Sequence, residues 1–396
     1  MLITGGRVLI DSGVYLEDGA VLIKGDSIVA VGPHEQVVEQ AGADVPRLDV
    51  DGTVLPGLID AHVHLAFDGG PDPVSTLQDS TDEVLFEDMR RRAAQLLFSG
   101  VTTARDLGDR NGLALRLAAE IDDRRTPGPR IVSAGTPATT KGGHCFFLGG
   151  EVSGEAEIRD LVRRNAAAGA GVIKAMATGG GLTKSGPKSA ETQFTTEELA
   201  ALVDEAHRAG LPVAAHAHGA DGIAAAVEAG VDTIEHCTWM ADDGGLDFRP
   251  DVVQQIVDRG IAVCPAVSPH WQMLPRIFGE ERAQGMFELV RRMADSGVRL
   301  VAGTDAGVQR AGFDGLRTAL SFYSHLGLAP ASIIDMATSE AAAALGLGSV
   351  TGRIAPGYRA DLLLVDGDPL ADLDALKNVR AVIASGRRYD PSTAAE

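Results

Sequence analysis

The segment PGLIDAHVH, residues 56–64, decides how the rest of the chain is interpreted. It carries two histidines, His62 and His64, in an apolar run that is typical of a buried strand. Side chains alternate between the faces of a strand, so both imidazoles are expected on one face and Val63 on the other. Two imidazoles on one face are suited to binding a single cation.

Further residues with metal-binding side chains follow later apolar, β-branched runs of the chain. They are Lys174, His216, His236 and Asp305. Separate packing roles would not explain why one such residue recurs at the ends of several predicted strands. We therefore predict that these residues form one metal centre with the two histidines of the first strand.

The middle of the chain repeats a unit of amphipathic helix, glycine and short β-branched run. Glycines 100, 171, 210, 230, 260 and 297 stand at the helix ends. One helix is marked by a capping-box pattern of Thr195 and Glu198 and is closed by Gly210. About eight such strands predict an α/β protein of the (β/α)₈ TIM-barrel class, in which the C-terminal strand ends carry the chemistry.

The two chain ends differ from the middle because apolar and polar positions alternate, as in residues 20–32 and 379–388. Both ends are too short to fold alone. We therefore predict a small β-sandwich domain formed by residues 1–54 together with 349–396. It would enclose a metal-dependent catalytic barrel domain of residues 55–348.

Composition narrows the class of partner. The formal net charge of −20 argues against nucleic acids and anionic membranes, so a small-molecule substrate is expected, and a homo-oligomer is left open. The three cysteines form no CxxC pair, and no signal peptide or apolar run of roughly 20 residues is seen. We expect a soluble, cytoplasmic protein.

Lys174 lies in an apolar strand, where an ammonium group is costly to bury. One explanation is an ion pair with Asp305, Asp106 or another carboxylate of the barrel. The other is a carbamate, formed when the lysine reacts with CO₂, that bridges two metal ions. The residues alone leave both open. Arg105 and Asp106 are expected to pair with each other at the end of the strand 101–106.

Six motifs make the chain resemble the amidohydrolase superfamily almost from end to end. They are PGLIDAHVH (56–64), VIKAMATGG (172–180), AAHAHG (214–219), IEHC (234–237), AGTDAG (302–307) and GRIAPGYRADLLLVDGDPL (352–370). In particular, the chain is similar to the imidazolonepropionase- and prolidase-like branch, which has a binuclear metal centre.

That resemblance implies two divalent metal ions, with zinc expected. It implies that the more buried ion is bound by His62, His64 and Asp305. It further implies that His216 and His236 bind the more exposed ion, with a carboxylated Lys174 bridging the two.

The resemblance also implies roles for two other histidines. His218 shares a face with His216, and it would contact the substrate or stabilise the transition state. His144 follows Gly142 and Gly143 and would contact a substrate carbonyl or carboxylate. An ordinary loop role for His144 remains open.

The predicted function is hydrolysis of an amide bond, in a dipeptide or an N-acyl amino acid. A metal-bridging hydroxide would attack, with Asp305 as general acid and base. The same centre suits a urea, carbamate, lactone or organophosphate. A mononuclear deaminase using Glu235, and a non-catalytic binding protein, are the remaining alternatives.

Substrate specificity is expected in the loops that follow the strands, especially residues 179–193, with Lys184 and Lys188, and residues 265–279. No arginine stands in a motif position that marks a carboxylate-binding site. The sequence therefore does not identify the substrate.

Overall fold

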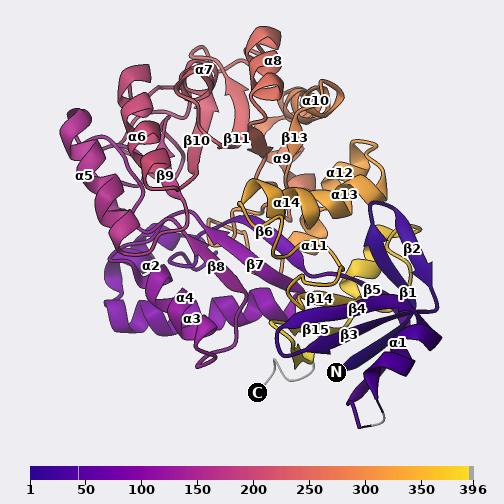
Figure 1. The fold of residues 1–396 in the computed structure, drawn as a ribbon. Helices are drawn as coiled ribbons and strands as arrows, with labels where there is room; N and C mark the ends of the chain where they lie inside the picture. Colours follow the sequence, from indigo (N-terminus) through magenta and orange to yellow (C-terminus); the bar gives the residue numbers. More distant parts are fainter. Residues whose placement is uncertain (43, 392–396) are drawn as a thin grey trace.

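The protein is an α/β protein with parallel strands, seen in a computed structural model that describes residues 1–42 and 44–391 (Figure 1). Two parallel sheets form its central part. The first has the order β6-β7-β8, and the second the order β13-β12-β11-β10-β9. Their bounds are β6 Leu58–Val63, β7 Val101–Asp106, β8 Arg130–Ser133, β9 Ile173–Met176, β10 Val213–Gly219, β11 Thr233–Met240, β12 Ala262–Cys264 and β13 Arg299–Leu300. Each lies within or overlaps a run predicted to be a strand.

Isolated bridges link the two sheets at both joints. Val63 at the end of β6 pairs in parallel with Ala306, which follows β13, and Ala138 after β8 pairs with Ala175 of β9. Within residues 1–42 and 44–391, however, the assigned strand pairs do not form one closed ring. The structure therefore shows two linked parallel sheets rather than the continuous barrel that was predicted.

Helices alternate with these strands, and α5 to α8 lie outside β9 to β11 (Figure 1). Their bounds are α2 Pro73–Asp79, α3 Asp82–Phe98, α4 Leu113–Asp122, α5 Gly154–Ala167, α6 Thr196–Arg208, α7 Ala220–Ala229, α8 Pro250–Asp258, α9 Leu274–Phe278, α10 Glu280–Asp295, α11 Leu316–Ala319, α12 Ser321–His325, α13 Pro330–Met336 and α14 Ser339–Ala344. Short 3₁₀ turns cover Phe146–Leu148, Trp271–Met273 and Leu373–Lys377. The capping box predicted for α6 is confirmed, because Thr195 and Glu198 each accept a hydrogen bond from the other's backbone amide.

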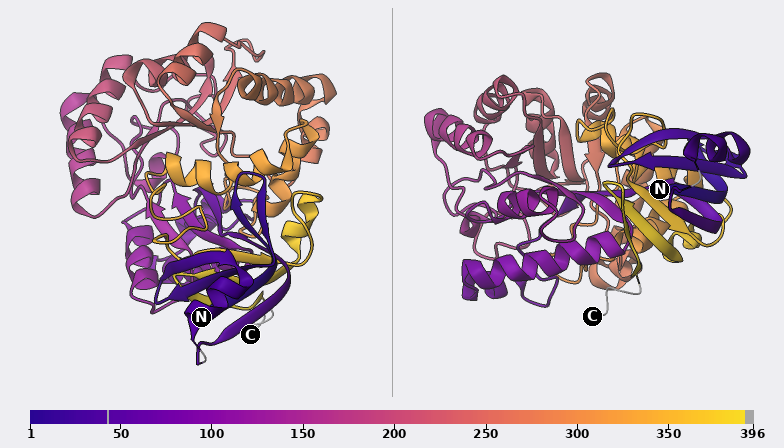
Figure 2. Two further views of the ribbon diagram at one scale, coloured as in Figure 1. Left: turned by 45° about the vertical axis from the view of Figure 1, so that its right-hand side comes forward. Right: turned by 60° about the horizontal axis from the view of Figure 1, so that its bottom comes forward.

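The chain ends form one eight-stranded sheet, in which N-terminal and C-terminal strands lie side by side (Figure 2). Its order is β16-β15-β14-β5-β1-β3-β4, with β2 paired to β1. The bounds are β1 Leu2–Asp11, β2 Val14–Glu17, β3 Gly19–Lys24, β4 Ser27–Pro33, β5 Arg47–Pro56, β14 Leu362–Val365, β15 Val379–Ala384 and β16 Arg387–Tyr389, and α1 His34–Ala41 follows β4.

A β-sandwich is not confirmed for this part of the protein, because its strands are assigned to a single sheet. Alternating polarity predicts that a segment is a strand, but it does not say whether several strands pair in one sheet or two. The division into two domains, 1–54 with 349–396 and 55–348, stays a prediction.

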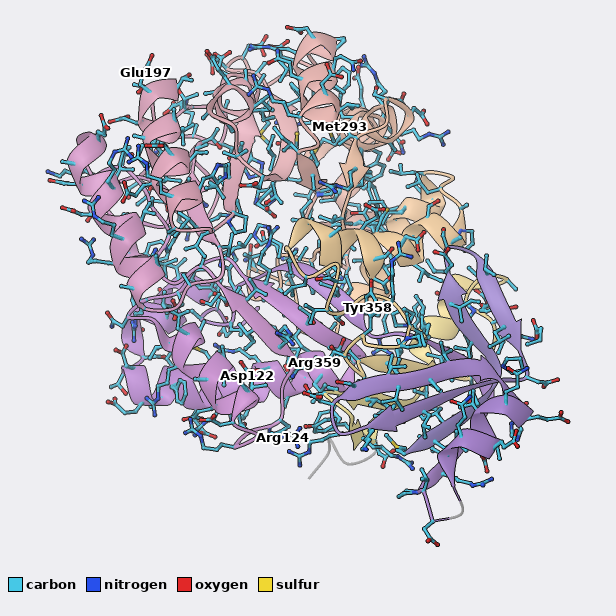
Figure 3. The ribbon with its side chains drawn as sticks, in the orientation of Figure 1. Asp122, Arg124, Glu197, Met293, Tyr358 and Arg359 are labelled. Carbon is cyan, nitrogen blue, oxygen red and sulfur yellow. The ribbon has the colours of Figure 1, made fainter. Side chains whose placement is uncertain are left out.

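The chain-end sheet and the central part share one apolar core. Leu55 of β5, Leu363 of β14 and Val382 of β15 belong to the same buried cluster as Leu97 and Val101. The segment that leads into β14 is held by polar contacts of Tyr358 and Arg359, which are among the residues labelled in Figure 3. The Tyr358 hydroxyl donates to the Gly348 carbonyl, and the Arg359 guanidinium donates to the Ser385 hydroxyl.

None of the helices in residues 1–42 and 44–391 combines the length and the apolar character that crossing a membrane requires.

Candidate metal centre

Three side chains converge at the end of β6. His62 Nε2 lies 3.3 Å from His64 Nε2 and 3.3 Å from Asp305 Oδ1, and His64 Nε2 lies 3.6 Å from the same oxygen. Ligand atoms about 2.0–2.2 Å from a tetrahedral zinc ion stand roughly 3.3–3.6 Å apart. The three atoms therefore fit one divalent cation.

The other ring nitrogen of each histidine is already bonded. His62 Nδ1 lies 2.9 Å from Glu235 Oε2, and His64 Nδ1 lies 3.2 Å from the carbonyl oxygen of Gly108. A proton on Nδ1 is then required in both rings, which leaves the Nε2 lone pairs free to bind a metal. Burial also lowers the pKa of both imidazoles, His64 to about 4, which favours the neutral form that binds metals.

A second group consists of His216, His218 and His236, with ligand atoms within 4.8 Å of one another. His216 Nε2 lies 3.0 Å from the Gly179 carbonyl oxygen, and His218 Nδ1 lies 2.9 Å from the Thr238 hydroxyl. The ring nitrogens that do not take part in these two contacts are His216 Nδ1 and His218 Nε2, and they are the atoms that could bind a metal. The structure brings both histidines of the HAHG motif together and does not separate their roles.

The two groups adjoin each other. The ring centroids of His62 and His236 are 5.1 Å apart, and those of His216 and His236 are 4.7 Å apart. Burial, followed by the neighbouring histidines and Lys174, lowers the pKa of His216 and His236 well below the usual range. Neutral imidazoles are therefore gathered around one small space.

Lys174 of β9 is 1% exposed, and within residues 1–42 and 44–391 its Nζ has no hydrogen-bond partner. Burial lowers the pKa of this amine to about 8. Asp106, one of the carboxylates expected to pair with Lys174, instead accepts hydrogen bonds from the amides of Leu65 and Gly108. A buried amine without a partner is costly, so it requires an explanation.

Asp305 and His236 have backbone conformations that side-chain-bearing residues seldom adopt. Their φ angles are +57° and +68°. A β-bulge accompanies this geometry in β11, because the register with β10 shifts between Ala217 and Gly219. Such strained residues and bulges cluster at functional sites, where they re-aim a side chain. Burial raises the pKa of the Asp305 carboxyl to about 7.

The role of Glu235 as a partner of His62 was missed from the sequence. Besides His62, its carboxylate accepts hydrogen bonds from the Arg105 guanidinium at 2.7 Å and from the Thr233 hydroxyl at 2.7 Å. The expected pair of Arg105 and Asp106 is wrong, because neighbours in a strand point to opposite faces. A buried glutamate within an apolar strand was the signal that could have revealed the contact.

His144 lies beside the second group. Its ring centroid is 4.6 Å from that of His216, its Nδ1 lies 3.4 Å from the Thr183 hydroxyl, and it is 4% exposed. A Cβ on Gly180 would stand 2.4 Å from the His144 ring, so only glycine permits this approach. Burial lowers the pKa of His144 to about 3, which keeps the ring neutral.

The two loops expected to set specificity both line cavities. Lys184 lines one of about 300 Å³ together with Phe146, Phe147 and Gln309, and Thr183 connects this cavity to His144. Lys188 is not among its lining residues. The segment after β12 lines a second cavity, which begins at His218 and His236.

Comparison with known proteins identifies the family. The model of the amidohydrolase family matches residues 53–389. Ochratoxinase of Aspergillus niger is 29% identical over 432 residues, covering 96% of this chain and 84% of that protein. Imidazolonepropionase of Geobacillus kaustophilus is 25% identical, with 89% and 85% covered.

Similarity to solved structures supports the same family. A Xaa-Pro dipeptidase with methionine bound in its active site is 29% identical, with a TM-score of 0.85 over 98% of this chain and 99% of that one. Together, the family match over most of the chain and this similarity show that the protein is a hydrolase of the amidohydrolase family.

Proposed function

We propose that the protein hydrolyses an amide bond in a small-molecule substrate, either a dipeptide or an N-acyl amino acid. The observation that carries this proposal is the convergence of His62 Nε2, His64 Nε2 and Asp305 Oδ1 at spacings that fit one divalent cation. The relatives support the amide bond, since one is a dipeptidase and another an ochratoxinase.

Two divalent ions, with zinc expected, would be held by the two groups of side chains. His62, His64 and Asp305 would hold the more buried ion, and His216 and His236 the more exposed one. The neutral Lys174 amine would form a C–N bond to CO₂ and release one proton, and the resulting carbamate anion would serve as a ligand shared by the two ions. The buried, unpartnered Nζ supports this step, because a carbamate would turn an orphaned donor into an anionic ligand.

Bound divalent ions supply Lewis acidity, which lowers the pKa of a water molecule and polarises the scissile carbonyl. Asp305 would take the proton of the attacking water at Oδ2 and deliver it to the leaving amine. A carboxylate beside the metal-bound water is a side chain that can accept a proton and return it. His218 and His144, both neutral and close to His216, would donate hydrogen bonds to the substrate's carbonyl oxygen as negative charge develops.

The contacts of Glu235 argue against a deaminase. Its Oε1 accepts from Arg105 and Thr233, and its Oε2 faces His62 Nδ1. Both oxygens are therefore used within the protein, and neither is free to protonate a ring nitrogen of a substrate. Ureas, carbamates, lactones and organophosphates suit the same centre chemically, and the experiment below distinguishes them from amides.

We further propose that the eight parallel strands belong to a (β/α)₈ barrel whose C-terminal strand ends carry this site. The bridges from Val63 to Ala306 and from Ala138 to Ala175 support this view, because they link the two sheets at both joints.

The test is a mass-spectrometric screen of zinc-loaded protein, shown to carry two ions per chain, against dipeptides and N-acyl amino acids. Release of free amino acids supports amide hydrolysis. Absence of turnover on all amides, with turnover on ureas, carbamates or lactones, would overturn it.

A second variant tests the bridging role of the lysine. Lys174→Ala is expected to lose metal, with partial rescue by a short carboxylic acid. Full metal content and full activity in this variant would contradict that role.

A further inference from the structure

An apolar cavity of about 190 Å³ opens directly from the candidate centre. It begins at His218 and His236, and its far wall is built by residues of α10, including Met286, Phe287 and Val290. α10 contacts β11, which carries His236, and α9 lies beside β13 in Figure 1. The cavity therefore extends from the reactive end of the strands outward between the helices.

The cavity wall is mostly apolar, and the polar side chains that line it are His218, His236, Thr238 and Ser268. Val267 follows β12, Leu274 comes from α9, and Phe322 comes from α12. Among the residues that the structure describes, no Asp, Glu, Lys or Arg side chain lines this cavity. A charged group placed there would lose its hydration without gaining an ionic partner.

Apolar surface continues outside the cavity. Leu274 lines it, while Met273, Ile277 and Phe278 around the same short helix are 38%, 53% and 46% exposed. Large apolar side chains gathered on an exposed segment mark a surface that binds something apolar. Here they adjoin a cavity that ends at two candidate catalytic or metal-binding histidines.

We propose that this cavity binds a large uncharged apolar side chain of the substrate, an aromatic ring or a long aliphatic chain, attached next to the scissile bond. The inference rests on the proposed amide hydrolysis and names its substrate class. A dry cavity of about 150 Å³ lined by Leu, Ile and Phe accepts benzene, so this volume suits one ring. Because His218 and His236 form its inner end, the group that fills it stands close to the reacting carbonyl.

Substrate selectivity follows from the burial of that side chain. Relative to alanine, a buried phenylalanine or leucine side chain is expected to raise kcat/KM by about 10- to 100-fold. For substrates with lysine or glutamate at the same position, kcat/KM is expected to be lower than for alanine, because the cavity offers no ionic partner.

The experiment uses metal-loaded protein and two dipeptide series, Ala-X and X-Ala, with X as Ala, Val, Leu, Phe, Lys and Glu. The expected result is a rise in kcat/KM from Ala to Leu and Phe in one series, with Lys and Glu lowest. Equal rates across both series, or a preference for a charged X, would overturn the proposal.

Variants that fill the cavity with a larger side chain test whether it binds the substrate side chain. Met286 lines it and is partly exposed, so Met286→Trp can grow into the space, and Val290→Phe serves if that variant does not fold. Both are expected to lower kcat/KM for the Phe dipeptide by a larger factor than kcat/KM for Ala-Ala, so that the preference for Phe is lost. Glu288→Trp is the control, because Glu288 is exposed on the same helix and does not line the cavity.

Binding of indole, an uncharged ring that is not hydrolysed, separates this inference from the proposed function. Indole binding to wild type and to Glu288→Trp, lost in Met286→Trp, supports the cavity even if no amide is cleaved. Amide cleavage without a side-chain preference and without indole binding overturns the cavity assignment and leaves amide hydrolysis standing.

Discussion

The carboxylate of Glu235 joins three strands behind the candidate centre. It accepts hydrogen bonds from His62 of β6, from Arg105 of β7 and from Thr233 of its own strand, β11. The carboxylate is fully buried. A buried carboxylate that orients a metal-binding imidazole fixes its tautomer and raises its basicity. Arg105 also donates to the Ala61 carbonyl, next to His62, so the guanidinium holds both the carboxylate and the strand.

Glu235→Gln should therefore weaken metal binding without removing any ligand atom. We expect a loss of about 10- to 100-fold in metal affinity, because His62 loses its anionic partner. Competition with a chromophoric chelator measures it. Glu228→Gln, at an exposed position of α7, is the control. Unchanged affinity in Glu235→Gln would show that the contact with His62 does not tune the site.

Asp305→Asn should lower turnover by roughly 10²- to 10⁴-fold, because the amide cannot accept and return a proton. The comparison is made on protein shown to carry the same metal content as wild type. Asp251→Asn, on the exposed side of α8, should behave like wild type. Near-normal turnover of a metal-loaded Asp305→Asn protein would rule out the acid–base role.

The buried amine of Lys174 should make the metal-free protein more stable at alkaline pH than at neutral pH. Its pKa is lowered from 10.5 to about 8, so between these values the unfolded chain holds a proton that the folded chain has lost. Stability should then rise with pH between about 8 and 10.5, and below this window the buried ammonium costs on the order of 3 kcal/mol.

Lys174→Met removes that cost, so at pH 7 the metal-free variant should be more stable than metal-free wild type. Urea unfolding at pH 7, 8, 9 and 10 measures the effect. The two proteins should converge as the pH rises. A constant difference across the series would show that the amine is not the group responsible.

At the scale of elements, the strands and helices could largely be predicted, since each is set by local pattern. The run 101–106 is a strand with those bounds, and α6 begins after its capping residue, Thr195. What local pattern does not contain is the conformation of single residues at strand ends. The positive φ of His236 and Asp305, and the bulge in β11, depend on contacts with distant strands.

The segment after β13 passes His62 so closely that a side chain does not fit. A Cβ on Gly303 would stand 2.5 Å from Cys264 Sγ and 2.9 Å from His62 Cβ. Gly303→Ala should therefore displace His62 or Asp305, weaken metal binding and destabilise the fold by about 1–3 kcal/mol.

Metal titration and urea unfolding measure both effects of Gly303→Ala. Gly32→Ala is the matched control, since its Cβ would meet Val37 at an ordinary 3.5 Å. Wild-type metal affinity and stability in Gly303→Ala would show that the close approach is not needed.

At the scale of the whole molecule, the candidate site was predictable only as a set of residues. The motifs indicated which side chains carry chemistry, and the strand-end rule indicated where they meet. His62 and Glu235, which contact each other, are 173 residues apart in the sequence, so no local pattern predicts their contact. The single chain-end sheet was missed for the same reason, because pairing of β5 with β1 and β14 is set by tertiary packing.

That sheet is expected to stabilise the site through the core that it shares with the central strands. Leu363 of β14 is fully buried, and its methyl groups lie about 3 Å from where a Cβ on Gly100, immediately before β7, would stand. Because β7 carries Arg105, the packing of Leu363 supports the strand that holds Glu235 in place.

Leu363→Ala should therefore lower the free energy of unfolding by about 2–5 kcal/mol, since it leaves a cavity at this junction. Val29→Ala in β4 of the same sheet removes a side chain that is 44% exposed and should cost less than about 0.5 kcal/mol. Urea denaturation of the metal-free proteins compares them. An equally small loss in both variants would mean that the chain-end sheet contributes little to the stability of the central strands.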